Sequence, residues 1–206
     1  MNLRRKMHSR SSMTLGFVCP KCHWYQTVRA SAHMTYLTSF EETQTTPKLD
    51  LTNIIYDCPH CSQRMRRVSW YMAPQIAKLL ELSNVDADNC RTEYDSIKPN
   101  SQYPDRALVT FPSISIEDTH IGLLAQIAER LADEPNYTQR IYVRNTHVYD
   151  DLTPPYISLE SGMYGSDIIS YDMKDAPAVR QKHRELFMEF LNELIKRYEE
   201  ELNNGN

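Results

Sequence analysis

Four of the five cysteines in this 206-residue chain occupy two copies of one short pattern, Cys-Pro-x-Cys. The first copy runs from Cys19 to Cys22 and the second from Cys58 to Cys61. A tight Cys-x-x-Cys turn directs two thiolates at an ion about 2.3 Å away, and two such turns complete a tetrahedron around zinc. Proline suits the turn because its φ angle is fixed. The pattern therefore predicts one metal site built from all four cysteines.

Other chemistries of paired cysteines fit this chain less well. The opening sequence MNLRRKMHSRSSM lacks the apolar core of a secretory signal, and cytosolic thiols stay reduced, so a metal is favoured over disulfides. A redox Cys-x-x-Cys opens a helix in a βαβ unit, which neither pair does. Iron uses similar turns, so the spacing leaves zinc and iron open. We expect zinc, in a closed structural site without an open catalytic position.

The doubled pattern resembles the zinc ribbon, in which two knuckles at the ends of β-hairpins share one structural zinc. The resemblance covers about residues 14–71, where segments rich in β-branched and aromatic residues flank the cysteines. It implies that Cys19, Cys22, Cys58 and Cys61 are the zinc ligands. Ribbons often have glycine after each second cysteine, where the backbone turns left-handed, and His23 and Ser62 stand there instead. The 35 residues between the pairs predict a long central hairpin with EETQTTPK as its outer loop.

The remaining sequence predicts a small α/β domain. APQIAKLLELSN reads as a helix, residues 84–104 as a linker or long loop, and RALVTFPSI and RIYVRNTHVYD as strands. A helix is expected before Pro135, with Ser115 and Asp118 forming a capping box. TPPYISLESGMYGSDIISYD reads as loop with one short strand. The expected fold class is α+β, a zinc-ribbon β domain (residues 1–72), a short helix and linker (73–104), and an α/β domain (105–206).

A long amphipathic helix is expected to end the chain, opening at Pro177. Its apolar stripe either packs on the domain's own sheet or binds a partner or a second copy. The stripe consists of Val179, Leu186, Phe187, Phe190, Leu191, Leu194, Ile195, Tyr198 and Leu202.

Charge is distributed unevenly along the chain. Residues 1–72 carry ten Lys and Arg against four Asp and Glu, a net +6, whereas the remainder carries a net −10. A basic part on an acidic body suggests a polyanionic partner for that part. Arginines of a β-ribbon can meet phosphates while exposed aromatic rings stack on unpaired bases, or those rings can be the ribbon's core. The predicted nucleic-acid contacts are Arg64, Arg66, Arg67, Arg29, Trp24 and Trp70.

Signals for catalysis are weaker. With five glycines and no glycine cluster, the chain contains neither a Walker loop nor a dinucleotide-binding fingerprint. A metal-dependent hydrolase would use His147, Asp150 and Asp151, with His120 or His183 nearby. The unpaired Cys90 reads as a buried apolar residue.

These patterns favour a non-catalytic zinc-binding adaptor. Its basic ribbon would attach to nucleic acid or to a nucleic-acid-handling complex, and its acidic domain would contact a protein partner. The alternatives are a structural or assembly protein of a larger particle, for example a viral one, and the hydrolase. No membrane-spanning run is present, so we expect a cytoplasmic or virion location.

Overall fold

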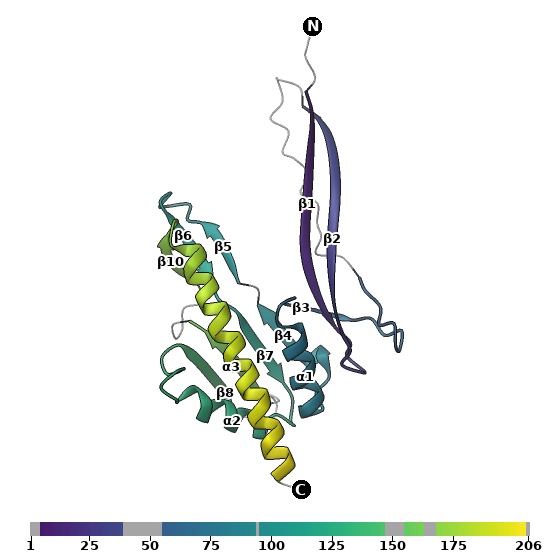
Figure 1. Ribbon diagram of the computed structural model, residues 1–206, viewed down its shortest axis with the longest axis vertical. Coiled ribbons are helices and arrows are strands. Elements are labelled where there is room, and N and C mark those ends of the chain that lie inside the picture. The colour runs from purple at the N-terminus through teal and green to yellow at the C-terminus, as the bar shows by residue number, and fades with distance from the viewer. Residues whose placement is uncertain (1–4, 39–54, 94, 147–154, 163–167, 205–206) are drawn as a thin grey trace.

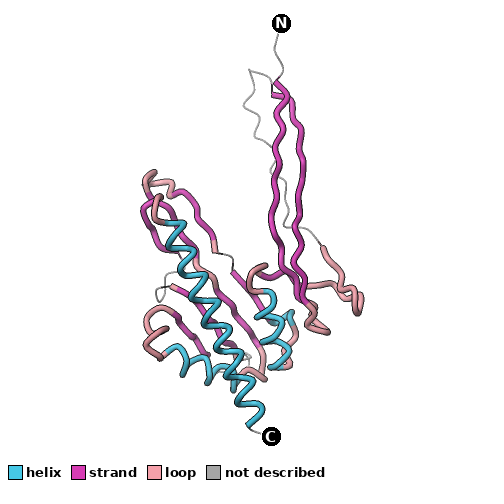
Figure 2. The backbone as a smooth tube through the Cα atoms, in the orientation of Figure 1, coloured by secondary structure: helices cyan, strands magenta, loops and turns pink. Residues whose placement is uncertain are grey.

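The computed structural model describes residues 5–38, 55–93, 95–146, 155–162 and 168–204, and the structural statements below concern these ranges. This part of the chain forms a mixed α+β fold with ten strands in three antiparallel sheets and three α-helices. One sheet lies at the N-terminus, and two sheets and the helices make up the body, meaning the described residues from Ala73 onward (Figures 1 and 2).

The N-terminal sheet has the order β2-β1-β3. Strand β1 (Arg5–Val18) pairs with β2 (Tyr25–Thr38) along its whole length, whereas β3 (Arg66–Val68) pairs only with the end of β1. The parts of β1 and β2 beyond β3, residues 5–15 and 28–38, therefore form a two-stranded arm. This arm projects away from the body, as Figure 1 shows. At about 3.4 Å per residue its eleven residue pairs span about 35 Å.

The base of β1 is buried on both of its faces. Leu15 and Phe17 pack into a small apolar cluster around the cysteines. Val18, together with Val68 of β3, belongs to the main core, which also contains the first helix. Gly16 leaves no room for a side chain, because a Cβ atom there would lie 2.6 Å from the Cα of Trp70. The N-terminal sheet is thereby fixed to the body.

On one side of the body, the pairing of two chain segments begins in one sheet and continues in the other. One sheet has the order β4-β7-β9-β8 and the other β10-β6-β5. Glu93 pairs with Ser113 and Ser96 with Thr110, so the register continues unbroken from one sheet to the other on that side. The strands are β4 (Cys90–Glu93), β5 (Ser96–Pro99), β6 (Arg106–Thr110), β7 (Ser113–Glu117), β8 (Ile141–Thr146), β9 (Tyr156–Ser161) and β10 (Ile168–Asp172).

Helices cover one side of these sheets. They are α1 (Ala73–Ser83), α2 (Gly122–Ala132) and α3 (Ala176–Asn204), and α3 runs diagonally across both sheets in Figure 1. The middle of the apolar stripe of α3 is buried in the main core, including Phe187, Phe190 and Leu194 at 0% exposure. The middle of the stripe is therefore packed in the protein's own core, and a partner or self contact through α3 stays a prediction.

An ion-paired cluster joins α3 to the start of β5. The Asp95 side chain is only 3% exposed and accepts a hydrogen bond from Nη2 of Arg184 at 2.6 Å. The Nε of Arg180 lies 3.5 Å from the same carboxylate oxygen. The guanidinium of Arg184 also lies 4.4 Å from the ring centroid of Tyr71, which follows β3. Residues far apart in the sequence are thus held together beside the N-terminal sheet.

Three local expectations differ from the structure. The predicted capping box is wrong, because Ser115 lies within β7 and α2 begins at Gly122 without a side-chain cap. Ile114 and Ile116 alternate into the core, and this burial favours a strand there. The segment 84–104, expected to be a linker or loop, contains β4 and β5. The segment 153–172, expected to be a loop with one short strand, contains two strands, β9 and β10.

The sheets of the body are antiparallel, so the α/β arrangement expected for residues 105–206 is an antiparallel α+β one instead. The two helices at the ends of the body's sequence were expected and are present as α1 and α3. The three-part division of the chain stays a prediction. None of the described helices combines the length and the hydropathy needed to cross a bilayer.

Candidate metal centre

The first cysteine pair lies in a tight turn between β1 and β2. The backbone amide of Cys19 donates to the carbonyl of Trp24 at 2.8 Å, and the amide of His23 donates back to Cys19 at 3.1 Å. His23 has a φ of 55°, so it adopts the left-handed conformation expected after the second cysteine. Its ring Nε2 lies 3.0 Å from the carbonyl oxygen of Val85, a contact that joins this turn to the body.

The second pair repeats the same backbone geometry. The amide of Cys58 donates to Gln63 at 2.8 Å, and the amide of Ser62 donates back to Cys58 at 2.8 Å. Ser62 has a φ of 57°. Two segments of unrelated neighbouring sequence thus form the same turn, and each turn directs both of its thiols to one side.

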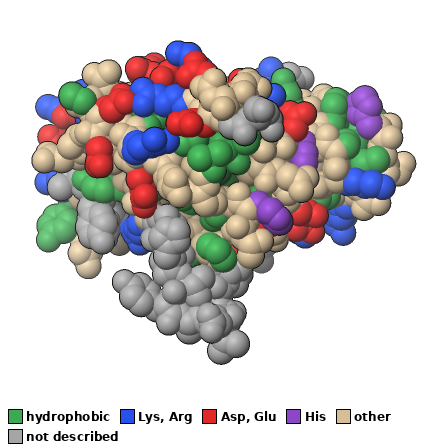
Figure 3. Space-filling model, turned by 90° about the horizontal axis from the view of Figure 1, so that it is seen from below, with side chains coloured by type: hydrophobic (Ala, Val, Ile, Leu, Met, Phe, Trp, Pro, Cys, Tyr) green, Lys and Arg blue, Asp and Glu red, His purple; other side chains and the backbone are tan. Residues whose placement is uncertain are grey.

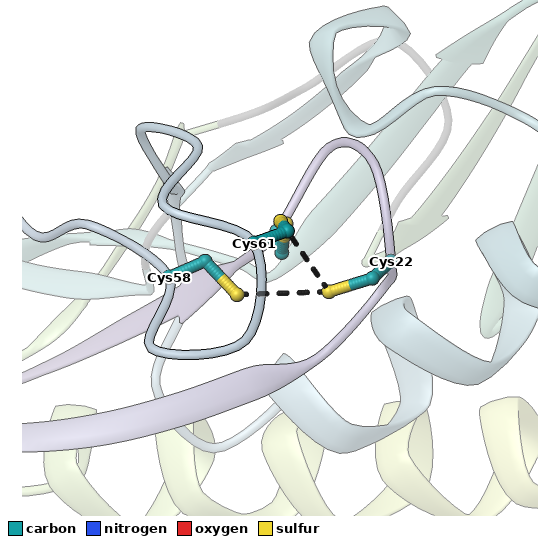
Figure 4. A group of neighbouring side chains, drawn as sticks. Cys22, Cys58 and Cys61 are labelled. Atoms are coloured by element: carbon teal, nitrogen blue, oxygen red, sulfur yellow. Dashed lines mark hydrogen bonds between the residues drawn. The ribbon is translucent and has the colours of Figure 1, made fainter.

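The four sulfur atoms meet between the two turns, as Figure 4 shows for Cys22, Cys58 and Cys61. The Sγ atoms of Cys19 and Cys61 are 3.4 Å apart, those of Cys22 and Cys58 are 3.6 Å apart, and those of Cys22 and Cys61 are 3.9 Å apart. All four lie within 4.8 Å of one another. Sulfurs 2.3 Å from a tetrahedral ion are separated by about 3.8 Å. The four predicted ligands therefore cluster at the spacing that a metal ion such as zinc requires.

The electrostatic surroundings of the sulfurs are uneven. Burial raises the pKa of the Cys19 thiol to about 12. Burial acts in the same direction on Cys58, but hydrogen bonds from the backbone amides of His60 and Cys61 and from the side chains of Cys22 and Cys19 together lower the pKa of Cys58 to about 7. Amides that point at a sulfur stabilise the thiolate, which is the form that binds a metal. The second turn is therefore arranged to hold negative charge on its first sulfur.

A small apolar cluster surrounds the site. Leu15, Phe17 and Met65 are buried against Cys19 and Cys58. Two ring contacts lie at the edge of this cluster. Phe17 stacks on Tyr56 with centroids 5.5 Å apart, and Trp24 meets His60 at 5.0 Å. So few apolar side chains make a thin core, and a metal would supply the remaining stability.

The predicted nucleic-acid contacts do not gather on one surface. Arg66 is ion-paired with Asp88 of the body. Arg67 is paired in register with Phe17, and Arg66 with Val18, so the two arginines lie on opposite faces of the sheet.

The other four predicted contacts are also spread out. Trp24 is half-buried against the cysteine cluster. Trp70 is 41% exposed and meets Tyr71 edge to face. Arg64 is exposed in the second turn, and only Arg29 belongs to the arm.

The strand register of the arm reveals a pattern that the sequence alone did not suggest. Residues 5–38 contain no Asp or Glu. Residues paired across the arm share a face, and alternate pairs share the same face. One face therefore holds the positions of Lys6, Arg10 and Arg29, together with His8 and His33, whereas the other holds one arginine and otherwise mainly serine and apolar residues. The spacing of two between Lys6, His8 and Arg10 in the first strand could have indicated a shared face.

The candidate catalytic residues receive no structural support. His147, Asp150 and Asp151 lie outside the described residues. Nδ1 of His120 lies 2.7 Å from a carboxylate oxygen of Asp118, and the His120 side chain is exposed.

His183 lies 2.9 Å from the hydroxyl of Ser161, but Ser161 is 4% exposed and the charged groups that act on His183 are Arg140 and Lys182. Among the described residues, the charged groups that act on the pKa of His183 are cations, whereas the base of a nucleophilic site is oriented by a third group such as a carboxylate. Burial raises the pKa of the Cys90 thiol to about 12, which disfavours the reactive thiolate form of this fifth cysteine.

Comparison with protein families, with curated proteins and with solved structures finds no match to this chain or its fold. Its function therefore has to be argued from its own structure, namely the four-cysteine cluster and the arm.

Proposed function

We propose that this protein is a non-catalytic zinc-binding adaptor. A zinc ribbon holds the basic arm, the arm attaches to nucleic acid or to a nucleic-acid-handling complex, and the acidic body contacts a protein partner. The observation that carries the proposal is the arm itself, which is acid-free, projects from the body and holds the positions of Lys6, Arg10 and Arg29 on one face.

The shape and charge of the arm suit a polyanion. A two-stranded β-ribbon fits into a groove of duplex nucleic acid or lies along a single strand. Lys and Arg neutralise phosphates and release counterions, which favours binding. The body offers no comparable surface on the face shown in Figure 3, where Lys, Arg, Asp and Glu side chains are intermixed.

The metal has a structural part in this proposal. All four ligand positions of the site would be filled by cysteine, so no position is open for substrate. An isolated two-stranded ribbon is at best marginally stable in water. A zinc ion that fixes the turn between β1 and β2 would hold the base of the arm against the body, and the arm would keep its direction.

Charge reversal on the arm tests the proposal. The triple variant Lys6→Glu, Arg10→Glu, Arg29→Glu should bind a single-stranded oligonucleotide much more weakly than the wild-type protein does. The slope of log K against log salt concentration should fall in magnitude by about 2, at roughly 0.7 for each phosphate that the arm no longer neutralises. Binding would be measured by fluorescence anisotropy at several salt concentrations, and zinc content would verify that the variant keeps its site.

A matched variant removes the same charge from the body. Lys98, Lys174 and Lys196 are exposed, and their reversal to Glu changes the net charge equally. This control should bind with nearly the wild-type salt slope. Equal loss of affinity in both variants would mean that only net charge matters, and absence of binding by the wild-type protein would refute the proposed function.

A second candidate function is assembly into a larger particle. In the part of the chain that the structure describes, β3 covers only Gly16–Val18 of β1, and the outer edge of β2 carries no further strand. Open strand edges can pair with another chain. A molecular mass that rises with protein concentration, without any affinity for nucleic acid, would favour this function.

A further inference from the structure

A cleft lies where the first cysteine turn meets α1. Its volume is about 360 Å³, within the range of sites that hold small molecules or parts of larger ones. Its walls include three aromatic rings from the two cysteine turns and three residues along one side of α1, namely Trp24, Tyr25, His60, Pro74, Lys78 and Glu81. In Figure 1, α1 lies beside the base of β1 and β2, where this cleft is formed.

The aromatic walls are built from both turns. Trp24 follows the first cysteine pair and His60 lies within the second, and their ring centroids are 5.0 Å apart. A metal that joins the turns would fix both rings relative to each other. Tyr25 is 46% exposed, so its ring has free surface beside them. Rigid rings with open surface are what a planar ligand stacks on.

The α1 side of the cleft supplies a donor and an acceptor. The ammonium of Lys78 lies 3.6 Å from a carboxylate oxygen of Glu81 and 3.0 Å from Glu199 of α3. Lys78 and Glu81 are 41% and 63% exposed at their side chains, so both can reach a ligand in the cleft. Their charges cancel, and a phosphate group gains little from the pair. The polar edge of a nucleobase, which presents both donors and acceptors, is complementary to it.

The position of Tyr25 connects the cleft to the arm. Tyr25 pairs in register with Val18, and alternate positions of β2 place Tyr25, Thr27 and Arg29 on one face. This is the face that holds Lys6 and Arg10 farther out. A strand of nucleic acid that follows the basic face with its phosphates therefore arrives at the cleft.

We infer that this cleft holds an unpaired nucleobase of a single-stranded nucleic acid whose phosphates lie on the basic face of the arm. The base stacks on Tyr25 beside Trp24 and His60, and its polar edge faces Lys78 and Glu81. The inference rests on the proposed function and adds to it a preference for single-stranded nucleic acid with intact bases.

The test compares two 20-nucleotide DNA single strands, one of mixed sequence and one in which abasic sites replace the bases. Both carry the same phosphates, so binding through charge alone treats them equally. Base–aromatic stacking is worth about 1–3 kcal/mol per base, so the abasic strand should bind about 5- to 150-fold more weakly. Tyr25→Ala should remove most of this difference. Tyr103→Ala, at an exposed tyrosine between β5 and β6, should leave it unchanged.

Two further measurements keep the outcome decisive. Zinc content shows whether Tyr25→Ala retains the metal site. Trp70→Phe leaves Trp24 as the only tryptophan, and its fluorescence should be quenched by the intact strand but not by the abasic one. Equal, salt-dependent binding of both strands without quenching would overturn the base site and leave the proposed function standing. Absence of binding by either strand would overturn both.

Discussion

Loss of one cysteine ligand should unfold the turns around the metal site and leave the body folded. The variant Cys58→Ser removes a sulfur whose pKa is lowered to about 7 by hydrogen bonds from backbone amides and neighbouring thiols. Serine does not replace a thiolate as a zinc ligand, so the affinity for zinc should fall steeply.

The size of this effect follows from the cluster around the site. Leu15, Phe17 and Met65 are its buried apolar side chains besides the cysteines. At about 1.5–3 kcal/mol each, their burial contributes about 5–9 kcal/mol. Ordering the backbone of the roughly twelve residues in the two turns costs about 12–24 kcal/mol. Burial therefore falls short of the ordering cost by about 3–19 kcal/mol, and a structural zinc supplies about 10 kcal/mol or more. Without the metal, the turns should therefore not stay ordered.

Amide hydrogen exchange read by mass spectrometry measures this directly. In zinc-loaded wild-type protein, peptides covering the two turns, residues 19–24 and 56–65, should be protected, and in Cys58→Ser their exchange should approach that of an unfolded chain. Peptides from α3 should keep their protection in both proteins, because their buried residues belong to the main core. Cys90→Ala is the matched control, since Cys90 lies outside the four-cysteine cluster. Unchanged protection of both turns in Cys58→Ser, with zinc absent, would refute the reasoning.

Three other changes should have defined effects. Gly16→Ala should lower the free energy of unfolding by about 1–3 kcal/mol, because the added Cβ would lie 2.6 Å from the Cα of Trp70. Gly122→Ala should not lower it, because nothing lies within 4 Å of a Cβ at that position. Urea titration compares the two variants, and equal stabilities would contradict the packing described for Gly16. Asp95→Asn should cost about 3 kcal/mol in the same assay, since it leaves the Arg184 charge partly buried without its partner, and a loss under 1 kcal/mol would contradict this. Burial lowers the pKa of His183 below its usual 6.5, so its contribution to stability is fully present above about pH 6.5 and is lost as the pH falls towards the lower folded value. Between pH 5 and 8, the melting temperature of His183→Gln should change less with pH than that of the wild-type protein. The same pH dependence in both proteins would contradict this prediction.

The four-cysteine cluster was predictable because its determinants are local. The spacing of Cys19 to Cys22 and of Cys58 to Cys61 sets two turns regardless of what surrounds them. The positions of α1 and α3 were predictable for the same reason, since a period of 3.6 residues and a proline near the start are visible in the sequence.

Features that depend on distant pairing were missed. Residues 5–13 are polar and basic, with little strand signal, yet they form a strand because their backbone pairs with β2. The extent of the arm was therefore not expected. Ser115 looked like a helix cap because of its spacing to Asp118, but burial of Ile114 and Ile116 against the helices made it part of β7.

The candidate nucleic-acid contacts show the same limit. Arg66 and Arg67 are adjacent in sequence, and alternation in a strand places them on opposite faces. Arg10 and Arg29 are far apart in sequence, and the register of β1 and β2 places their positions on one face. Composition indicated a basic N-terminal part, but only the pairing of the strands indicates which residues act together.

X-ray absorption at the zinc edge, on protein purified without added metal, tests the central claim most directly. The account predicts one zinc per chain with a first shell of four sulfur atoms at about 2.3 Å. A protein that contains no stoichiometric metal while the two turns, residues 19–24 and 56–65, remain protected from exchange would contradict it, and so would a shell with nitrogen or oxygen in place of one of the sulfurs.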